Sequence, residues 1–139
     1  MNILFFLTPK AEVAHVEERD SLRQIMEKME YHGYTAIPLL SNDGKYIGTI
    51  TEGDLLWSLK AENFPDLKEL ENRKIIDIPR RRDNRAVKID ETMENLFETV
   101  KNQNFVPVVD DNNVFIGIVT RKDVLSYLGK QLKEHVINQ

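Results

Sequence analysis

The residues best suited to binding chemistry are two threonine–aspartate pairs with the same spacing. They lie in residues 48–54 (GTITEGD) and 117–123 (GIVTRKD), where a predicted strand ends and a predicted helix begins. Free backbone N–H groups and the helix dipole favour an anion at such a turn, and the threonine hydroxyl can donate to a phosphate oxygen. The aspartate, three residues on, can accept two hydrogen bonds from a ribose diol. The pattern predicts a site for a phosphorylated nucleoside. A helix-capping box is the alternative, and the two roles can coexist.

The two pairs belong to an internal duplication. Residues 34–56 align with residues 103–125 at a constant offset of 69 without a gap, and upstream the offset becomes 71. The first copy therefore has two extra residues near Gly33. The identities that fix the register pair Pro38 with Pro107, Gly48 with Gly117, Thr51 with Thr120 and Asp54 with Asp123. Repeated types at one fixed spacing indicate a duplicated structural unit.

The elements that must position these residues follow from hydrophobic periodicity. Helical spacing of apolar residues predicts one helix capped by Asp20 or Ser21 and another capped by Asp90 or Thr92. Alternating segments around turn residues predict hairpins over 35–40 with 46–51 and over 105–109 with 115–120. A helix follows each hairpin. We expect an α+β (mixed α/β) fold of two tandem β-α-β-β-α repeats, packed sheet to sheet with pseudo-twofold symmetry. The expected division is 1–60, a connector over 61–80, and 81–139, forming one compact pair.

Composition excludes several classes of function. The absence of cysteine excludes a disulfide framework, a thiolate zinc site and a cysteine nucleophile, and it fits a reducing compartment. The net charge of −4 disfavours general nucleic-acid binding. The apolar run at residues 3–7 is far shorter than the roughly 20 residues of a membrane span, so we expect a cytoplasmic protein without a membrane partner. The three histidines are scattered and no nucleophile–base pairing is evident, so we expect no metal, no cofactor and no enzymatic activity.

From about residue 10 to residue 128, the doubled pattern resembles a cystathionine-β-synthase (CBS) domain pair, also called a Bateman module. The resemblance implies adenine-nucleotide ligands, homodimers and regulation of an unknown effector protein. The stretches VAHV (13–16) and GYTAIP (33–38) are also similar to small stand-alone CBS-pair proteins of Gram-positive bacteria, some of which bind cyclic di-AMP.

In this family each cleft combines strand residues of one copy with the threonine–aspartate turn of the other. The favoured first cleft would comprise Ala14, Tyr34, Thr35, Ala36, Ile118, Thr120, Arg121, Lys122 and Asp123. A weaker second cleft would comprise Ala86, Asn104, Phe105, Ile50, Thr51 and Asp54. The ranking follows because Phe105 stands where the first copy has the small Ala36, and because Glu52 would repel a phosphate that Arg121 and Lys122 would attract.

The ligand and its further contacts have alternatives. The two aspartates favour AMP, ADP or ATP, because cyclic di-AMP has no free 2′,3′-diol; cyclic di-AMP is the first alternative and a ligand-free dimerising adaptor the second. Arg80, Arg82 and Arg85 lie in a basic stretch and are candidates for further phosphate contacts, with a solvated loop or a small basic patch for nucleic acid as the alternatives. Arg121, as a cation at a helix start, is expected to contribute little to the stability of the fold.

Overall fold

The computed structural model describes residues 2–137, which divide into two compact units. The first-copy unit is Ala14–Asp83, and the second-copy unit combines the described residues up to Val13 with those from Asn84 onward. Each unit contains one repeat in the predicted order of strand, helix, strand, strand, helix. The predicted α+β fold with two tandem repeats is confirmed.

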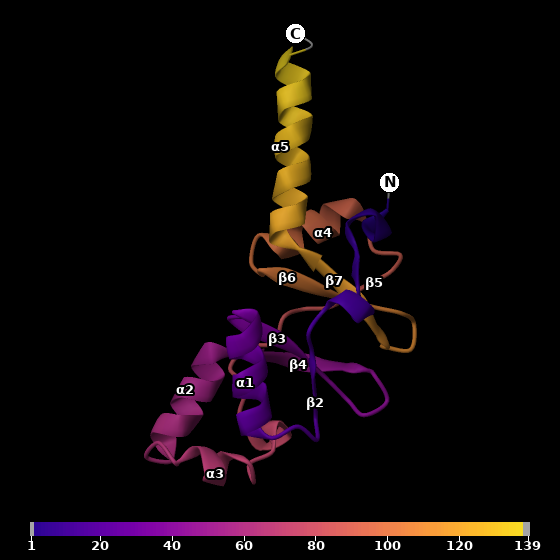
Figure 1. The fold of residues 1–139 in the computed structure, drawn as a ribbon. Helices are drawn as coiled ribbons and strands as arrows, with labels where there is room; N and C mark the ends of the chain where they lie inside the picture. The colour runs from indigo at the N-terminus through magenta and orange to yellow at the C-terminus, as the bar shows by residue number, and fades with distance from the viewer. Residues whose placement is uncertain (1, 138–139) are drawn as a thin grey trace. The chain divides into compact units, whose positions relative to one another are not determined.

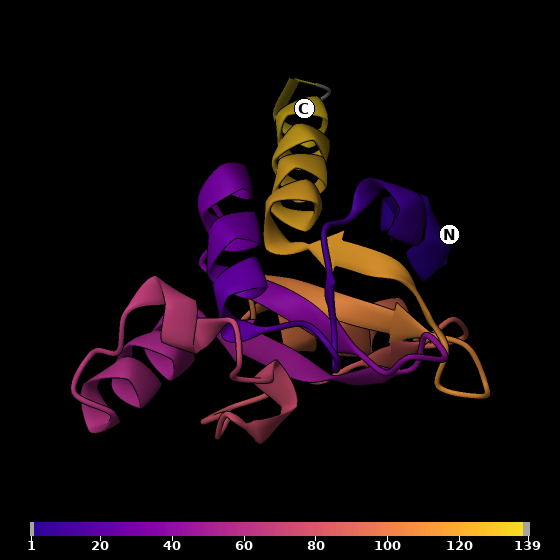
Figure 2. The ribbon, with the colours of Figure 1, turned by 60° about the horizontal axis from the view of Figure 1, so that its bottom comes forward.

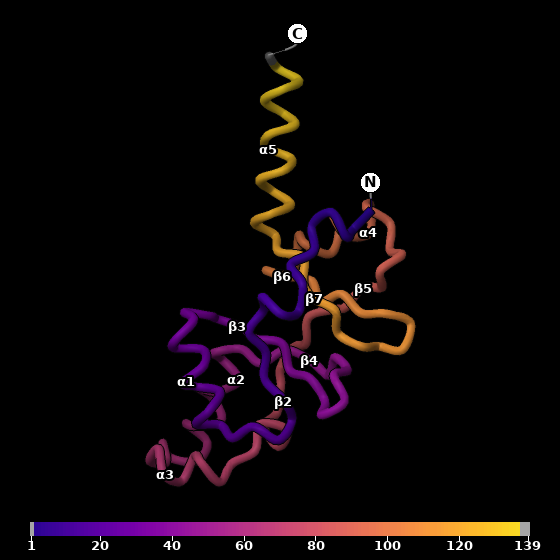
Figure 3. Tube along the Cα trace, turned by 45° about the vertical axis from the view of Figure 1, so that its right-hand side comes forward, coloured from indigo at the N-terminus to yellow at the C-terminus, as the bar shows by residue number. Residues whose placement is uncertain are grey.

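The first-copy unit is a three-stranded sheet with two long helices. The sheet order is β2-β3-β4, with β2 parallel and β4 antiparallel to β3. In Figures 1 and 3, α1 and α2 lie side by side. The elements are β2 (Val16–Glu17), α1 (Leu22–His32), β3 (Ala36–Leu40), β4 (Tyr46–Thr51), α2 (Glu52–Ala61), α3 (Leu67–Leu70) and the 3-10 helix η3 (Ile75–Asp77).

The second-copy unit has a fourth strand, contributed by the N-terminal segment. Its sheet order is β1-β7-β6-β5, and β1 pairs antiparallel with β7, as Figure 2 shows for the indigo segment beside the orange strand. The elements are η1 (Ile3–Phe6), β1 (Thr8–Pro9), η2 (Lys10–Glu12), β5 (Val87–Lys88), α4 (Met93–Val100), β6 (Phe105–Val109), β7 (Phe115–Thr120) and α5 (Arg121–Ile137). None of the helices within residues 2–137 has both the length and the apolar character needed to cross a bilayer.

The N-terminal segment is anchored in the core of the second-copy unit. Ile3 and Phe6 are buried with Val119 and Val124 in one hydrophobic cluster. The Phe6 ring also contacts the ring of Tyr127 on α5 edge to face, with centroids 5.3 Å apart. Residues far apart in sequence therefore complete the core beside the start of α5.

The helix starts confirm the capping predictions and choose between their alternatives. Ser21, not Asp20, caps α1, and its side chain and that of Gln24 form a reciprocal capping box. Thr92, not Asp90, caps α4. The first helix is 11 residues long and the second 8, and α1 ends at Gly33 in the left-handed region (φ 68°). The predicted insertion thus provides a glycine C-cap in the first copy only.

Two glycines, one on β4 and one on β7, allow another segment of the chain to approach closely. A Cβ at Gly48 on β4 would lie 2.3 Å from Asp83 Oδ1, which accepts a hydrogen bond from the backbone N–H of Thr49 at 3.0 Å. A Cβ at Gly117 on β7 would lie 2.2 Å from the carbonyl oxygen of Thr8, and the φ of 156° also favours glycine. The aligned glycines therefore make room for different segments.

The segment after α2 contributes to the core, which the sequence analysis did not predict. Leu70 and Ile75 are 2% and 0% exposed and belong to the hydrophobic cluster of the first-copy unit. The backbone N–H of Leu22 donates to the carbonyl of Arg73, so this segment also holds the start of α1. Its apolar residues, spaced irregularly among charged ones, gave no clear helical period.

Candidate functional site

Both threonine–aspartate pairs lie at a strand-to-helix turn, as predicted. Thr51 ends β4 and caps α2, and Thr120 ends β7 directly before α5. In each turn the threonine Oγ1 accepts the backbone N–H of the aspartate at 3.1 Å. The two turns differ in what the aspartate carboxylate does.

The Asp54 carboxylate is enclosed by its own unit. The residue is 2% exposed; its Oδ2 accepts the backbone N–H of Thr51 at 3.0 Å and its Oδ1 accepts that of Arg81 at 3.0 Å. The first turn is therefore a complete capping box that also fixes residue 81. Hydrogen bonds of backbone N–H groups to a buried carboxylate are among the stronger ones in proteins.

The Asp123 carboxylate, by contrast, is exposed. Within the part of the chain that the structure describes, it accepts no hydrogen bond and forms no ion pair, and the exposed ammonium of Lys122 beside it also has no carboxylate partner. The second turn thus has both an acceptor and a cation available.

The guanidinium of Arg121 has a structural role. Its Nε donates to the carbonyl oxygen of Val100 at 2.7 Å, and one terminal nitrogen reaches that of Lys101 at 3.5 Å. These carbonyls end α4, which lacks the glycine C-cap that ends α1. These hydrogen bonds speak against the expectation that Arg121 contributes little to the fold, because its side chain satisfies helix-end carbonyls.

The residues predicted to contact the base differ between the copies. In the first copy Thr35 is exposed, while Tyr34 and Ala36 are half-buried. The Tyr34 ring stacks on that of His32, with centroids 5.2 Å apart. In the second copy Phe105 is only 8% exposed, so little of its side chain is left for contact with a ligand.

Gln103, which the sequence analysis did not single out, connects backbone segments of the second-copy unit through its side-chain amide. Its side-chain oxygen accepts the backbone N–H of Arg85 at 2.7 Å, and its amide nitrogen donates to the carbonyls of Arg85 and Phe105, both at 3.1 Å. The offset of 69 aligns Gln103 with Tyr34. The glutamine in place of a tyrosine was the signal in the sequence for this role, because a side-chain amide at this position can bridge two backbone segments.

The remaining predicted residues occupy varied environments. Ala14, Ala86, Ile118 and Thr120 are half-buried, and Asn104 is exposed. Ile50 is fully buried in the hydrophobic cluster of the first-copy unit, which leaves its side chain no surface for a ligand.

The three candidate arginines are engaged to different degrees. Arg80 pairs with Asp83 at 2.8 Å and is therefore used within its own unit. Arg85 is exposed, and its charge is one of the causes that lower the pKa of Glu91, after hydrogen bonds from Asn95 and the Thr92 backbone. Arg82 is exposed and forms no hydrogen bond or ion pair with residues 2–137. Arg82 is the most available of the three.

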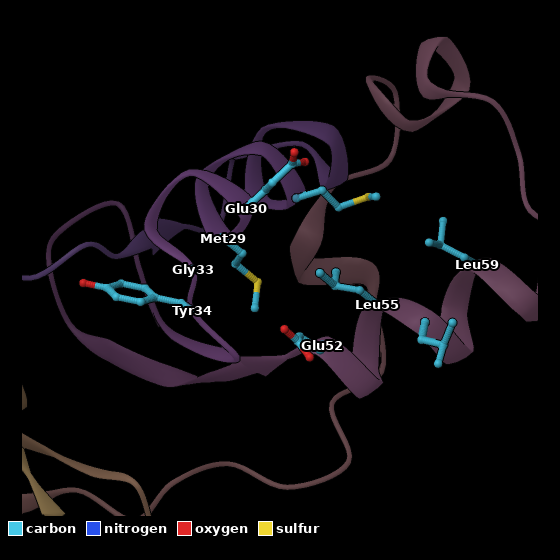
Figure 4. Close-up of a pocket in the computed structure, with 9 residues that line it drawn as sticks. Met29, Glu30, Gly33, Tyr34, Glu52, Leu55 and Leu59 are labelled. Carbon is cyan, nitrogen blue, oxygen red and sulfur yellow. The ribbon is translucent and has the colours of Figure 1, made fainter. Parts of the chain in front are cut away.

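A groove of about 430 Å³ runs along α1 and α2 of the first-copy unit, and its lining includes the predicted base contact Tyr34 and Glu52 of the first turn. Its lining is mostly apolar, with Met29 and Leu55 between the carboxylates of Glu30 and Glu52 in Figure 4. Two carboxylates and no cation in the lining disfavour a phosphate ligand. The groove is therefore less suited to a phosphate than the second threonine–aspartate turn, where Lys122 is exposed.

Comparison with known protein families identifies the family to which this chain belongs. The family model described as CBS domain matches residues 7–61 and again residues 75–130. The chain therefore belongs to the CBS-domain family, as a pair of domains.

Three individual proteins show what this chain is similar to within the family. Cyclic di-AMP receptor B of Bacillus subtilis is 32% identical over 133 residues, covering 92% of this chain and 86% of the relative. The crystal structure of Listeria monocytogenes CbpB in complex with c-di-AMP is 26% identical, with a TM-score of 0.81 and coverage of 99% and 98%. Cystathionine beta-synthase of Saccharomyces cerevisiae is 28% identical over 136 residues but is far longer, and this chain spans 26% of that enzyme.

Proposed function

We propose that this chain is a non-catalytic regulatory protein that binds cyclic di-AMP and acts through an effector protein. The similarity along almost its whole length to a cyclic di-AMP receptor supports this ligand. The proposal keeps residues 34–36 as candidates for contacts to the adenine base, and residues 120–123 as candidates for contacts to the phosphates.

The choice of ligand rests on this similarity to cyclic di-AMP receptors, and the enclosed carboxylate of Asp54 removes one of the two candidate acceptors for a ribose diol. A ribose diol needs a carboxylate with free acceptor positions, and both oxygens of Asp54 already accept backbone N–H groups. Only the second turn therefore keeps the acceptor that a mononucleotide would use. Cyclic di-AMP, whose 3′ oxygens are esterified, has no diol to satisfy and needs only base contacts and cations.

AMP, ADP or ATP is a second candidate because the Asp123 carboxylate is exposed. A free diol could donate two hydrogen bonds to this group. The two candidates make opposite predictions for one variant, Asp123→Asn.

The deciding experiment is calorimetric titration of the wild type and Asp123→Asn with cyclic di-AMP, AMP and ATP, with cyclic di-GMP as the control for base recognition. If cyclic di-AMP is the ligand, it binds at one site per chain, and Asp123→Asn leaves its Kd nearly unchanged. If AMP or ATP is the ligand, the same variant costs ~1.5–3 kcal/mol, roughly ten- to a hundredfold in Kd. Failure of cyclic di-AMP to bind at millimolar concentration would exclude the main proposal.

The non-catalytic part of the proposal has its own test. Each bound nucleotide should be recovered unchanged by chromatography after prolonged incubation with the protein. Conversion of any of them that depends on protein concentration would contradict a purely regulatory role.

A further inference from the structure

The turn between α2 and α3 (Figure 1) holds a phenylalanine in a backbone conformation that this residue type rarely adopts. Asn63 and Phe64 have φ values of 59° and 55°, both in the left-handed region. Asparagine is common there and is sufficient to end a helix, as Gly33 is at the end of α1. Phe64 is bulky and precedes Pro65, and both properties favour an extended backbone. The end of the helix therefore explains the conformation of Asn63 but not that of Phe64.

The turn presents two apolar side chains to solvent. Phe64 is 61% exposed, and Leu67, three residues further on, is 53% exposed. Neither belongs to the hydrophobic clusters formed within residues 2–137. A left-handed conformation at such a residue lowers stability, and burial of the side chain does not offset this loss. Backbone strain that the fold does not require is typical of segments that contact a ligand or a partner.

A cavity of about 350 Å³ adjoins the turn. Its lining includes Ala61 and Glu62, which directly precede the turn, and Trp57, which is 42% exposed. Large aromatic side chains next to a hollow are typical of protein-binding surfaces, because they contribute most of the binding energy there. We call Phe64, Leu67 and Trp57, with this cavity, the turn surface.

The charge of the segment indicates the chemistry of a partner. Residues 62–71 contain four acidic residues and one lysine, a formal charge of −3, and all five are exposed. Glu62 and Glu71 pair with arginines of the same unit, whereas the Glu69 carboxylate forms no hydrogen bond or ion pair with residues 2–137. An apolar pocket with a basic rim is complementary to this segment, and two copies of the segment would repel each other.

We propose that the turn surface is where the effector protein docks, with Phe64 and Leu67 inserted into an apolar pocket whose rim is basic. This inference rests on the proposed regulatory function and adds the surface through which that function acts. Transient signalling interfaces bury less than about 1,200 Å², so a short turn with one neighbouring cavity is of a fitting size. All residues of the turn surface belong to the first-copy unit.

The effector is first identified by photo-crosslinking and then tested as a purified protein. A benzophenone side chain replaces Leu67 in one chain and the exposed Asn112 of the second-copy unit in a control chain, and both are irradiated in a lysate of the source cells. A protein that cross-links at position 67 and not at position 112 is purified. Its Kd for the wild type, Phe64→Gly and Asn63→Gly is then measured by calorimetry. Absence of such a protein would overturn the proposal.

The two glycine variants separate binding from folding. Glycine accepts the left-handed conformation at either position, but only Phe64→Gly removes an apolar side chain. We expect Phe64→Gly to weaken effector binding by about tenfold or more, while the urea midpoint of unfolding does not fall. Asn63→Gly should keep the Kd within about twofold of the wild type. Equal binding of the effector by Phe64→Gly and the wild type would overturn the proposal. So would a lower urea midpoint, because the fold would then need this side chain.

Charge and nucleotide binding give independent readouts. Glu69→Lys should weaken effector binding by about threefold or more and reduce its dependence on salt, whereas the matched reversal Glu94→Lys on α4 should change little. Phe64→Gly should bind cyclic di-AMP with the Kd of the wild type, so nucleotide titration tests the proposed function and effector titration tests the turn surface. A changed sedimentation coefficient of ligand-free Phe64→Gly would assign this side chain to contacts between copies of the chain and overturn the proposal.

Discussion

Tyr46 lies with its ring half-buried on β4 and its hydroxyl 2.8 Å from Thr49 Oγ1. Burial, the largest cause, raises the pKa of Tyr46 to about 12. Because the folded-state pKa lies above the unfolded value of about 10, the neutral phenol favours the folded state. This contribution is complete below about pH 10 and is lost as the pH rises toward about 12.

We therefore expect Tyr46 to titrate at high pH. In absorbance titrations of the phenolate band, a late component of the wild type should be absent from Tyr46→Phe. The same variant should lose less stability than the wild type between about pH 10 and pH 12, as measured by urea unfolding. A titration curve unchanged by the substitution would contradict this account.

Arg121 supplies a second test at this scale. The substitution Arg121→Ala removes the hydrogen-bond donors to the last carbonyls of α4. We expect this to lower the free energy of unfolding by about 1–2 kcal/mol. The melting temperature of the ligand-free protein should fall by several degrees. Lys122→Ala, the neighbouring exposed cation, is the matched control and should stay within about 0.5 kcal/mol of the wild type. Equal melting temperatures for the two variants would rule out the capping role.

The role of Arg121 shows where reasoning from the sequence stopped. Its position after Thr120 predicted a ligand contact, but the carbonyls it binds lie about twenty residues earlier, at the end of α4. The missing glycine in the second copy was visible in the alignment. What supplied the absent cap could only come from the tertiary structure.

At the scale of elements, we expect substitution of the two aligned glycines by alanine to lower the free energy of unfolding by unequal amounts. Gly117→Ala places a Cβ against the Thr8 carbonyl and in an unfavourable backbone conformation, so it should destabilise by about 2–4 kcal/mol. Gly48→Ala meets the Asp83 side chain, which can move, and should cost about 1–2 kcal/mol. Denaturant unfolding measures both.

The control for Gly48 is a double-mutant cycle with Asp83→Ala. Removing the carboxylate removes the obstruction, so the second substitution at Gly48 should then cost much less. Additive effects would mean that Asp83 is not what requires a glycine at this position.

The sequence was most informative about elements with a strong period. The strands at 46–51, 105–109 and 115–120 match the prediction at both ends, and β3 begins one residue later than predicted. The caps at Ser21, Thr51 and Thr92 also followed from local chemistry. The short α3 and η3 were missed because their contribution is tertiary: Leu70 and Ile75 complete a core whose other members lie elsewhere in the chain.

At the scale of the molecule, the two units should respond differently to loss of the N-terminus. Deleting residues 2–13 removes Ile3, Phe6 and strand β1 from the second-copy unit, and none of these belongs to the hydrophobic cluster of the first-copy unit. Hydrogen exchange should show lost protection in β6 and β7 with protection retained in β3 and β4. The matched variant Phe5→Ala, at a side chain 63% exposed, should leave both patterns nearly intact. Uniform loss across both sheets would contradict the assignment of these residues to one unit.

The pairing of β1 with β7 also sets an order of events during synthesis. The first-copy unit is continuous and is complete once Asp83 has left the ribosome, whereas Ile3 and Phe6 precede that unit and must wait for β7, which follows it. At about 5–20 residues per second, the wait is roughly 5–20 seconds. Throughout that interval the nascent chain displays an unpaired strand and a pair of large apolar side chains. Until β7 is made, residues 3–9 are therefore the kind of exposed apolar segment that a chaperone at the ribosome exit can shield.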